Sequence, residues 1–189
     1  MAKAQKTNHY VDNEKFLLAM TEFRSSVQKA ADNKDTRPQV PNYIGDCFIK
    51  IATHLSYKPN FINYTFRDDM ISDGVENCLQ YIDNFDPEKS KNPFAYFTQI
   101  IYYAFLRRIQ KEKKQLYIKY KSMERSGLMD ELTEQTSDGA RTSVREPSMY
   151  DNIQEFINSY EQGIENQKKK TAKAKKAKGL EKFSEWRLH

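Results

Sequence analysis

Aromatic and basic side chains are concentrated in one stretch of this 189-residue chain. Six aromatic residues fall within about three helical turns: Phe94, Tyr96, Phe97, Tyr102, Tyr103 and Phe105. Basic residues follow at once: Arg107, Arg108, Lys111, Lys113 and Lys114. Aromatic rings stack on bases, at about 1–3 kcal/mol per base, and basic side chains neutralise phosphates. The stretch therefore predicts a surface for unpaired nucleic acid; the alternative is an aromatic core stripe beside a solvated basic face.

The residues just before this stretch carry the opposite charge. Seven acids and no lysine or arginine occur in 68–88: Asp68, Asp69, Asp73, Glu76, Asp83, Asp86 and Glu88. Such a helix could hold a cation or a basic protein surface, or it could be an ordinary solvated face. Asp69 and Asp73 lie four residues apart, but no Ser-His pair or glycine-rich phosphate loop accompanies them. We expect no enzyme, no cofactor and no metal site.

Four helices are expected to position these side chains, over 11–31, 42–56, 64–84 and 93–125, in an all-α fold. Asp12 is expected to cap the first helix, and Asn92 with Pro93 to start the fourth. Gly74 inside the third helix indicates close approach of another backbone. The apolar stripe expected on that helix is Ile71, Val75, Cys78, Leu79 and Ile82.

The fourth helix carries two stripes. One consists of Phe97, Ile101, Ala104, Phe105 and Ile109 and is expected to lie in the core. The other consists of Tyr96, Ile100, Tyr103 and Arg107 and is expected to be at least partly exposed. Cys47 and Cys78 both lie on apolar stripes, so we expect buried free thiols rather than a disulfide.

The C-terminal third differs in composition. We expect a domain over 1–125, a flexible linker over 126–147, a short amphipathic helix over 148–167, a lysine-rich spacer over 168–179 ended by Gly179, and an apolar tail over 180–189. The tail carries Leu180, Phe183, Trp186 and Leu188, which is typical of a short motif for a partner's groove. The lysine tract is either a nucleic-acid tether or a solubilising spacer.

Bulk composition narrows the class of protein. The chain has 31 basic and 26 acidic residues, and seven of the lysines lie in 168–178, so the remainder is close to neutral. Mean hydropathy is −0.88, and no apolar run is long enough to cross a bilayer. The first ten residues lack the apolar core of a signal peptide. We expect a cytosolic protein without a membrane partner.

The run from Asp69 to Gly74, the following Tyr81-Ile-Asp-Asn-Phe85 and the segment 94–109 resemble region two of bacterial RNA polymerase sigma factors. The resemblance covers about 68–114 and implies a region two-like helical domain that binds core polymerase and melts promoter DNA. No helix-turn-helix pattern follows it. With the run Lys91-Asn-Pro-Phe-Ala-Tyr96 and the apolar tail, the chain is similar to the late-transcription sigma factors of T-even-type bacteriophages.

That resemblance implies a set of partners and site residues. The clamp helices of the largest subunit of the polymerase core would be contacted by Asp69, Ser72, Asp73, Val75 and Leu79. An AT-rich late promoter would be contacted by Phe94, Tyr96, Gln99, Ile100, Tyr103, Leu106, Arg107, Arg108 and Lys111. Tyr96 would stack on a flipped adenine. Gln99 and Ile100 stand where primary sigma factors carry a pair of tryptophans that wedges open the duplex fork. The apolar tail would reach the phage sliding clamp. A separate phage co-activator would take the place of the domain with which primary sigma factors recognise the upstream promoter element. The implied location is the host bacterial cytoplasm. The alternative is a helical single-stranded DNA- or RNA-binding protein independent of polymerase.

Overall fold

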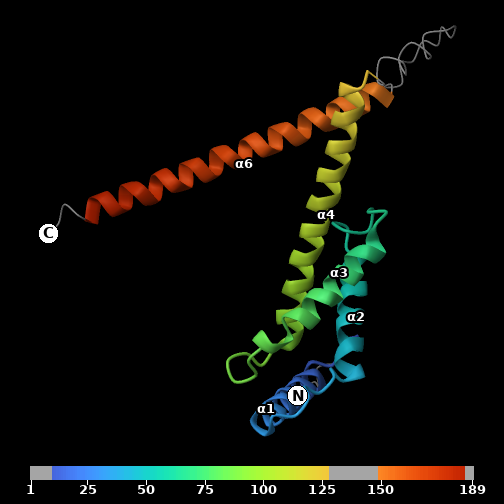
Figure 1. The fold of residues 1–189 in the computed structure, drawn as a ribbon, viewed down its shortest axis with the longest axis vertical. Coiled ribbons are helices and arrows are strands. Elements are labelled where there is room, and N and C mark those ends of the chain that lie inside the picture. The colour runs from blue at the N-terminus through green and yellow to red at the C-terminus, as the bar shows by residue number, and fades with distance from the viewer. Residues whose placement is uncertain (1–9, 128–148, 186–189) are drawn as a thin grey trace, which may run out of the picture. The chain divides into compact units, whose positions relative to one another are not determined.

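The structure, a computed structural model, describes residues 10–127 and 149–185, with side chains described in 10–127 and 151–173. This part of the chain is mostly helical and contains no strand. Figure 1 shows α1 (Asn13–Asn33), α2 (Asn42–Ser56), α3 (Arg67–Gln80), α4 (Pro93–Arg125) and α6 (Met149–Glu185). A short 3-10 helix, η1 (Ile82–Asn84), follows α3. The all-α expectation is therefore confirmed at the level of fold class.

The chain divides into two compact units, and the division falls inside α4, between Lys111 and Glu112. We call them unit 1 (residues up to Lys111) and unit 2 (residues from Glu112). The domain expected over 1–125 stays a prediction, and its end lies about four helical turns beyond this division. The expected linker over 126–147 lies almost wholly outside the described residues.

The helix starts in unit 1 follow from local capping. Asp12 caps α1 as expected, because its carboxylate accepts hydrogen bonds from the backbone N–H of Glu14 (3.1 Å) and Lys15 (3.3 Å). Asn92 caps α4, where its Oδ1 accepts from the N–H of Ala95 (3.0 Å), and Pro93 occupies the first helical position. These two caps fix where the first and last helices of unit 1 begin.

The core of unit 1 is built mainly of phenylalanine and isoleucine. Phe16 of α1, Phe48 of α2 and Phe97 of α4 meet there, with ring centroids 4.6–6.0 Å apart. The expected stripe of α4 is buried: Phe97, Ile101, Ala104, Phe105 and Ile109. Cys47 and Cys78 are buried free thiols, as predicted, and burial raises the pKa of Cys78 to about 12. The core thus fixes which side of α4 faces outward.

Helix α3 is shorter than predicted and turned about its axis. It spans Arg67–Gln80 rather than 64–84, and its buried residues are Met70, Gly74 and Cys78. The expected stripe lies one residue further along: Ile71 and Val75 are half-buried, and Leu79 is 44 % exposed. Cys78 and Ile82 of that stripe are buried as expected.

Gly74 lets α3 pack closely on α4. A Cβ at this position would lie 3.0 Å from Cγ2 of Ile101 and 3.1 Å from Cε1 of Phe105. The expected close approach is confirmed, but side chains of α4 make it rather than a backbone. Because α3 also packs against α2, it is held on two sides (Figure 1).

Unit 2 is a helical hairpin made by the last turns of α4 and the first part of α6. Ile153 and Ile157 are buried among Tyr117, Tyr120 and Met123. Tyr117 stacks on Tyr160 with centroids 4.5 Å apart. The short helix predicted over 148–167 is the first part of a longer one, because α6 continues through Gly179 to Glu185. Gly179 therefore does not end the helix.

Candidate functional site

One side of α4 in unit 1 combines an aromatic ring with amide and cationic groups. Gln99, Tyr103, Arg107 and Lys111 follow one another at intervals of four residues, so they lie along one side of the helix. All four are exposed, and Tyr103 is 50 % exposed. We call them the α4 row. Its members can stack on a base, hydrogen-bond to base edges or sugars, and neutralise phosphates.

Tyr96 belongs to the same side of α4 but is only partly accessible. Its ring lies 5.3 Å from that of Phe85 and meets Phe97 edge-on at 5.1 Å. Burial is the main cause that raises its pKa, followed by the neighbouring Cys78 thiol. The ring therefore contributes to the core while part of it faces solvent. Stacking of Tyr96 on a flipped base stays a prediction, and Tyr103 offers more ring surface.

The other residues predicted to contact DNA divide into two groups. Phe94, Ile100 and Leu106 are half-buried and pack against the core of unit 1. The two residues at the positions of the tryptophan wedge differ in accessibility. Gln99 faces solvent, and Ile100 packs against the core. A side chain that packs against the core can act as a wedge only with its remaining exposed part. Gln99 is therefore the better-placed member of the pair.

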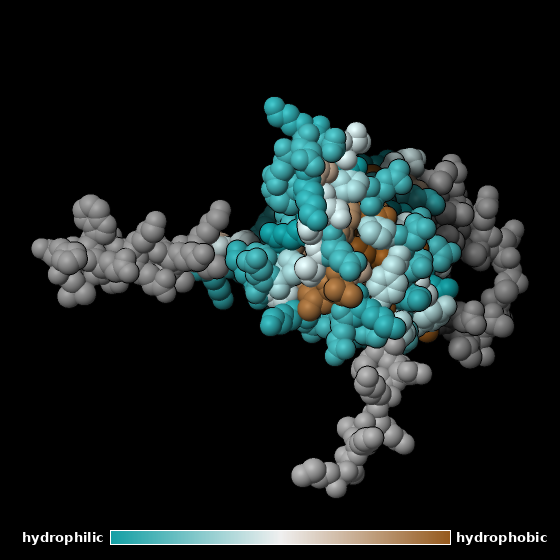
Figure 2. Space-filling view, turned by 90° about the horizontal axis from the view of Figure 1, so that it is seen from below, coloured by the Kyte–Doolittle hydropathy of each residue, from teal (hydrophilic) through white to brown (hydrophobic). Residues whose placement is uncertain are grey.

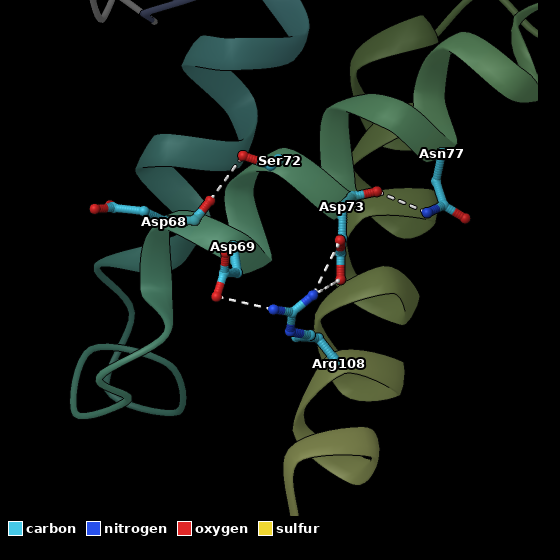
Figure 3. A network of polar contacts seen from close by, with 6 residues as sticks. All are labelled: Asp68, Asp69, Ser72, Asp73, Asn77 and Arg108. Carbon is cyan, nitrogen blue, oxygen red and sulfur yellow. Dashed lines mark hydrogen bonds and ion pairs between the residues drawn. The ribbon is translucent and has the colours of Figure 1, made fainter.

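Arg108 is engaged by α3 rather than displayed with the α4 row. Its Nη2 lies 2.8 Å from Oδ2 of Asp69, and its Nη1 lies 3.2 Å from Oδ2 of Asp73. Figure 3 shows the guanidinium reaching from α4 toward both carboxylates. The Arg108 side chain is only 17 % exposed. We therefore treat Arg108 as a link between α3 and α4, in place of the DNA contact suggested by the sequence.

A second link between the two helices involves Arg107. Its Nη2 donates to Oδ1 of Asn77 (2.6 Å), and Asn77 Nδ2 donates to the backbone carbonyl of Asp73 (2.6 Å). A guanidinium has five N–H donors, so one bond to Asn77 leaves others for a phosphate. Asn77 thus orients Arg107 without consuming its capacity to bind an anion. Sequence reasoning missed this orienting role of Asn77.

The surface of α3 that faces away from Arg108 is also acidic. Asp68, Ser72, Glu76 and Leu79 lie on one side of the helix, and all four are exposed. We call them the α3 face. Figure 3 shows the Asp68 side chain pointing away from Arg108. No ion pair of Asp68 or Glu76 is present among the residues that the structure describes. Sequence reasoning missed these two as site residues, although the 68-72-76 spacing would have grouped them with Ser72.

The five residues predicted to bind polymerase are only partly brought together on this face. Ser72 and Leu79 belong to it. Val75 is half-buried, and Asp69 and Asp73 turn toward Arg108, with side chains 60 % and 32 % exposed. Asp69 is therefore still reachable from solvent beside its ion pair. Asp73 is the less accessible of the two.

Two further acids of this region are used inside unit 1. Arg37 makes a two-point contact with Asp83, at 2.8 and 2.9 Å. Arg24 lies 3.3 Å from Asp86, whose pKa is lowered mainly by the backbone N–H of Glu88 and further by the charge of Arg24. These pairs fasten η1 and the following turn to α1 and the segment after it. Asp83 and Asp86 are therefore paired within unit 1. In the described part of the chain, the α3 carboxylates without an ion partner are those of Asp68 and Glu76 on the α3 face.

The described part of the chain shows no metal-ligand cluster and no membrane-spanning helix, and the predicted clamp-binding tail lies at its C-terminal edge. Within 10–127 and 151–173, no three histidine, cysteine, aspartate or glutamate side chains converge as metal ligands would. No described helix is both long and apolar enough to span a membrane. Of the predicted clamp-binding residues, Leu180 and Phe183 lie in the helical part of α6 without described side chains. Trp186 and Leu188 lie outside the described residues.

The surface seen in Figure 2 is mostly hydrophilic, and hydrophobic residues form only small areas on it. This face therefore offers no broad apolar patch of the kind that marks an obligate interface. Polar and charged side chains must carry most recognition there. The α3 face and the α4 row, with one exposed leucine and one well exposed tyrosine, share that character.

No protein-family model matches the chain, and no curated protein matches it. Function is therefore inferred from the residues and contacts of the described part of the chain. There the acidic α3 face and the aromatic and cationic α4 row lie on two helices joined by Arg108.

Proposed function

We propose that this protein is a sigma-type transcription initiation factor of the kind that directs late transcription in T-even-type bacteriophages. It acts without a catalytic centre, in the cytoplasm of the host bacterium. It binds the RNA polymerase core through α3 and opens an AT-rich late promoter along α4. Its C-terminal tail engages the phage sliding clamp, and a separate co-activator supplies upstream recognition. The observation that carries the proposal is the pairing of two chemically opposite surfaces on helices locked together inside unit 1.

The α3 face suits a protein partner rather than a nucleic acid. Asp68 and Glu76 offer carboxylates without ion partners in the described part of the chain, and Leu79 places an exposed aliphatic side chain beside them. A basic helical surface with apolar residues would satisfy both features. The carboxylates of Asp68 and Glu76 would repel the phosphates of a nucleic acid. The clamp helices of the largest polymerase subunit, implied by the sigma resemblance, are the partner that we propose.

The α4 row suits a melted strand. A base that leaves the duplex loses stacking, and Tyr103 can restore about 1–3 kcal/mol of it. Arg107 and Lys111 lie one and two turns further along and can neutralise the phosphates of the same strand. Gln99 lies one turn before Tyr103 and can hydrogen-bond to a base edge. An easily melted AT-rich site would favour this modest set of contacts.

The connection between the helices gives the two surfaces a joint function. Docking through α3 places α4 at a defined angle only if the two helices cannot slide past each other. Arg108 bridges them with two carboxylates, and the absence of a side chain at Gly74 keeps them in close contact. Binding energy gained at the polymerase can therefore position the α4 row at the promoter.

A polymerase-independent protein that binds single strands would need the α4 row but has no use for the α3 face. Co-elution with purified bacterial core enzyme separates the two functions. The native protein should co-elute with core, and the pair Asp68→Lys and Glu76→Lys should lose at least tenfold in affinity. Asp32→Lys with Asp35→Lys, two exposed acids at the end of α1, is the matched control and should bind normally.

The choice of residues in that test follows from the contacts. Reversing Asp69 and Asp73 would also remove both carboxylates from Arg108 and so disturb the helix packing. Reversing Asp68 and Glu76 leaves Arg108 untouched. Equal binding of the reversed pair and its control would overturn the docking role of the α3 face, and no co-elution of the native protein would overturn the sigma proposal itself.

Promoter opening is tested in the assembled holoenzyme. Tyr103→Ala should leave core binding intact and reduce the permanganate reactivity of thymines in an AT-rich late promoter, because the exposed ring no longer holds an unpaired base. Tyr57→Ala, which removes another exposed tyrosine ring from the end of α2, is the control. Unchanged reactivity in Tyr103→Ala would exclude the ring as a stacking platform.

A further inference from the structure

Helix α6 divides into a packed part and an unpacked part. Its first turns carry Ile153 and Ile157, which are buried, and the last side chain bound to α4 is Glu161, held by Tyr117 Oη (2.8 Å) and Lys121 Nζ (3.4 Å). Every residue from 161 to 173 is exposed. The second part of α6 therefore has no core-facing side, and tertiary packing does not explain its sequence.

Charge is segregated along the same helix. The acids Asp151, Glu155, Glu161 and Glu165 lie in the part up to residue 165. Lysines then occupy 168, 169, 170, 173, 175, 176 and 178, and no acid occurs among them. The helical rise places seven positive charges along about 15 Å, or one in about 2 Å. Duplex DNA carries one negative charge in about 1.7 Å of its axis, a density that this tract nearly matches.

The isolated helix is under electrostatic strain. Lys169 and Lys170 each lie one helical turn before Lys173, and like charges at such spacing cost about 0.2–0.5 kcal/mol per pair. Beyond Glu161, the only ion pair of α6 among the described side chains joins Lys169 to Glu165 (2.7 Å), and both side chains are exposed. An exposed pair contributes little. A polyanion would remove the repulsion and so strengthen the helix that it binds.

The surroundings of the lysines favour phosphates over a lipid surface. A helix that lies on a membrane needs an apolar side opposite its charges. Between 161 and 173 the only large apolar residue is Ile164, and lysines point to several sides of the helix. Phosphates on both walls of a DNA groove can meet charges that point in several directions, and the alanines between the lysines leave room for close approach.

We propose that the lysine-rich part of α6 binds duplex DNA through the phosphate backbone, independently of sequence and of RNA polymerase. This contact is separate from the α4 row and does not depend on the sigma proposal. It gives the protein a second attachment to DNA, in which the hairpin of unit 2 anchors the helix and the lysines provide the binding surface.

The test measures binding of the full-length protein to a duplex that lacks any promoter, by fluorescence anisotropy, from 50 to 300 mM salt and without polymerase. The variant carries Lys168→Gln, Lys169→Gln, Lys170→Gln and Lys173→Gln, since glutamine keeps the helix propensity and removes the charge. We expect at least a tenfold loss of affinity at low salt and a slope of log K against log salt shallower by about 3 to 4.

The matched control removes the same charge elsewhere, with Lys15→Gln, Lys29→Gln, Lys34→Gln and Lys50→Gln, all exposed in or beside α1 and α2. It should keep the native slope. A tract variant with the native slope and affinity, or a control that loses as much, would overturn the proposal. Binding to vesicles with phosphatidylserine as tight as binding to DNA would assign the tract to membranes instead. Circular dichroism should show helix gained on adding duplex to the native protein and not to the tract variant.

Discussion

Units 1 and 2 hold their helices together by different means. Unit 1 buries nineteen apolar residues in one cluster, and unit 2 buries two in the described part of the chain. In unit 1 a dense core sets the direction of each surface side chain, so the α3 face and the α4 row are positioned by packing. In unit 2 stacked tyrosines and exposed ion pairs hold a hairpin, and the lysines beyond it are free to adapt to a partner. We therefore expect unit 1 to recognise its partners through side chains held in fixed positions, and unit 2 through the density of its positive charge.

The largest expected effect comes from truncating one buried side chain in the core of each unit. Phe97→Ala should lower the free energy of unfolding of unit 1 by about 3–5 kcal/mol, because Phe97 contacts Phe16, Phe48 and Phe85. Ile157→Ala should increase amide exchange in 149–173 and leave 42–111 protected. Hydrogen exchange read peptide by peptide measures both. If Ile157→Ala exposed both regions equally, the units would not be independent.

A smaller effect with opposite signs is expected at two helical glycines. Gly74→Ala should destabilise unit 1 by about 1–3 kcal/mol, because its Cβ would press on Ile101 and Phe105. Gly163→Ala should stabilise α6 by about 0.5–1 kcal/mol, because its Cβ meets no atom within 4 Å and alanine favours helix. Urea unfolding followed by circular dichroism measures both changes. Equal effects would mean that α3 and α4 do not pack as described.

The ion pairs of the two units offer a third comparison. Arg108→Met should cost about 1–3 kcal/mol, since it leaves Asp69 and Asp73 without their common cation in a partly buried site. Lys121→Met removes a cation from Glu124 and Glu161 at the surface of unit 2 and should cost less than Arg108→Met, because solvent screens an exposed ion pair. Thermal unfolding of the two variants ranks them. A larger loss for Lys121→Met would reverse our ordering of the two links.

The smallest expected effect is a dependence of unit 2 on pH. The hydroxyl of Tyr117 and then Lys121 lower the pKa of Glu161 below its usual 4.5. A carboxylate with a lowered pKa in the folded protein stabilises it above about pH 4.5, and this stabilisation is lost as pH falls through the lowered value. Glu161→Gln should flatten the stability profile of unit 2 below pH 5, whereas the profile of unit 1 stays as in the native protein. Exchange of 149–173 between pH 3 and 6 measures it.

The sequence predicted α2 and α4 closely because their limits have strong local signals. Asn92 and Pro93 define the start of α4, and both bounds of Pro93–Arg125 agree with expectation. The core stripe of α4 was equally clear, since five apolar residues recur at helical spacing. The half-exposed second stripe followed from it. Of the α4 row, Tyr103 and Arg107 belong to that predicted stripe, whereas Gln99 and Lys111 do not.

The orientation of α3 could not be derived in the same way. Its buried line runs through Met70, Gly74 and Cys78, and a glycine adds nothing to an apolar pattern. The neighbouring line through Ile71, Val75 and Leu79 has three apolar side chains, so it gave the stronger signal. The engagement of Arg108 was also hidden, because it depends on the distance between residues more than thirty positions apart. Only the packed structure brings them together.

Helix α6 shows a further limit of reading glycine as a stop signal. Lysine and alanine before Gly179, and Leu180, Glu181 and Lys182 after it, all favour helix, and their combined propensity outweighs a cost of about 1 kcal/mol for the glycine. The charge segregation of the same segment was evident from composition. Its division into packed and unpacked parts could be recognised only from the contacts that Ile153, Ile157 and Glu161 make in the structure.

The placement of the two native thiols has a practical consequence for mapping these surfaces. The chain contains only Cys47 and Cys78, and both are sealed in the core of unit 1. Burial raises the pKa of each, so neither forms much thiolate near neutral pH, and maleimide reagents should pass them by. A cysteine introduced at position 76 or 99 would then be the sole labelling site in the folded protein. A photo-crosslinker attached there would report which subunit, or which nucleotide, lies within its reach.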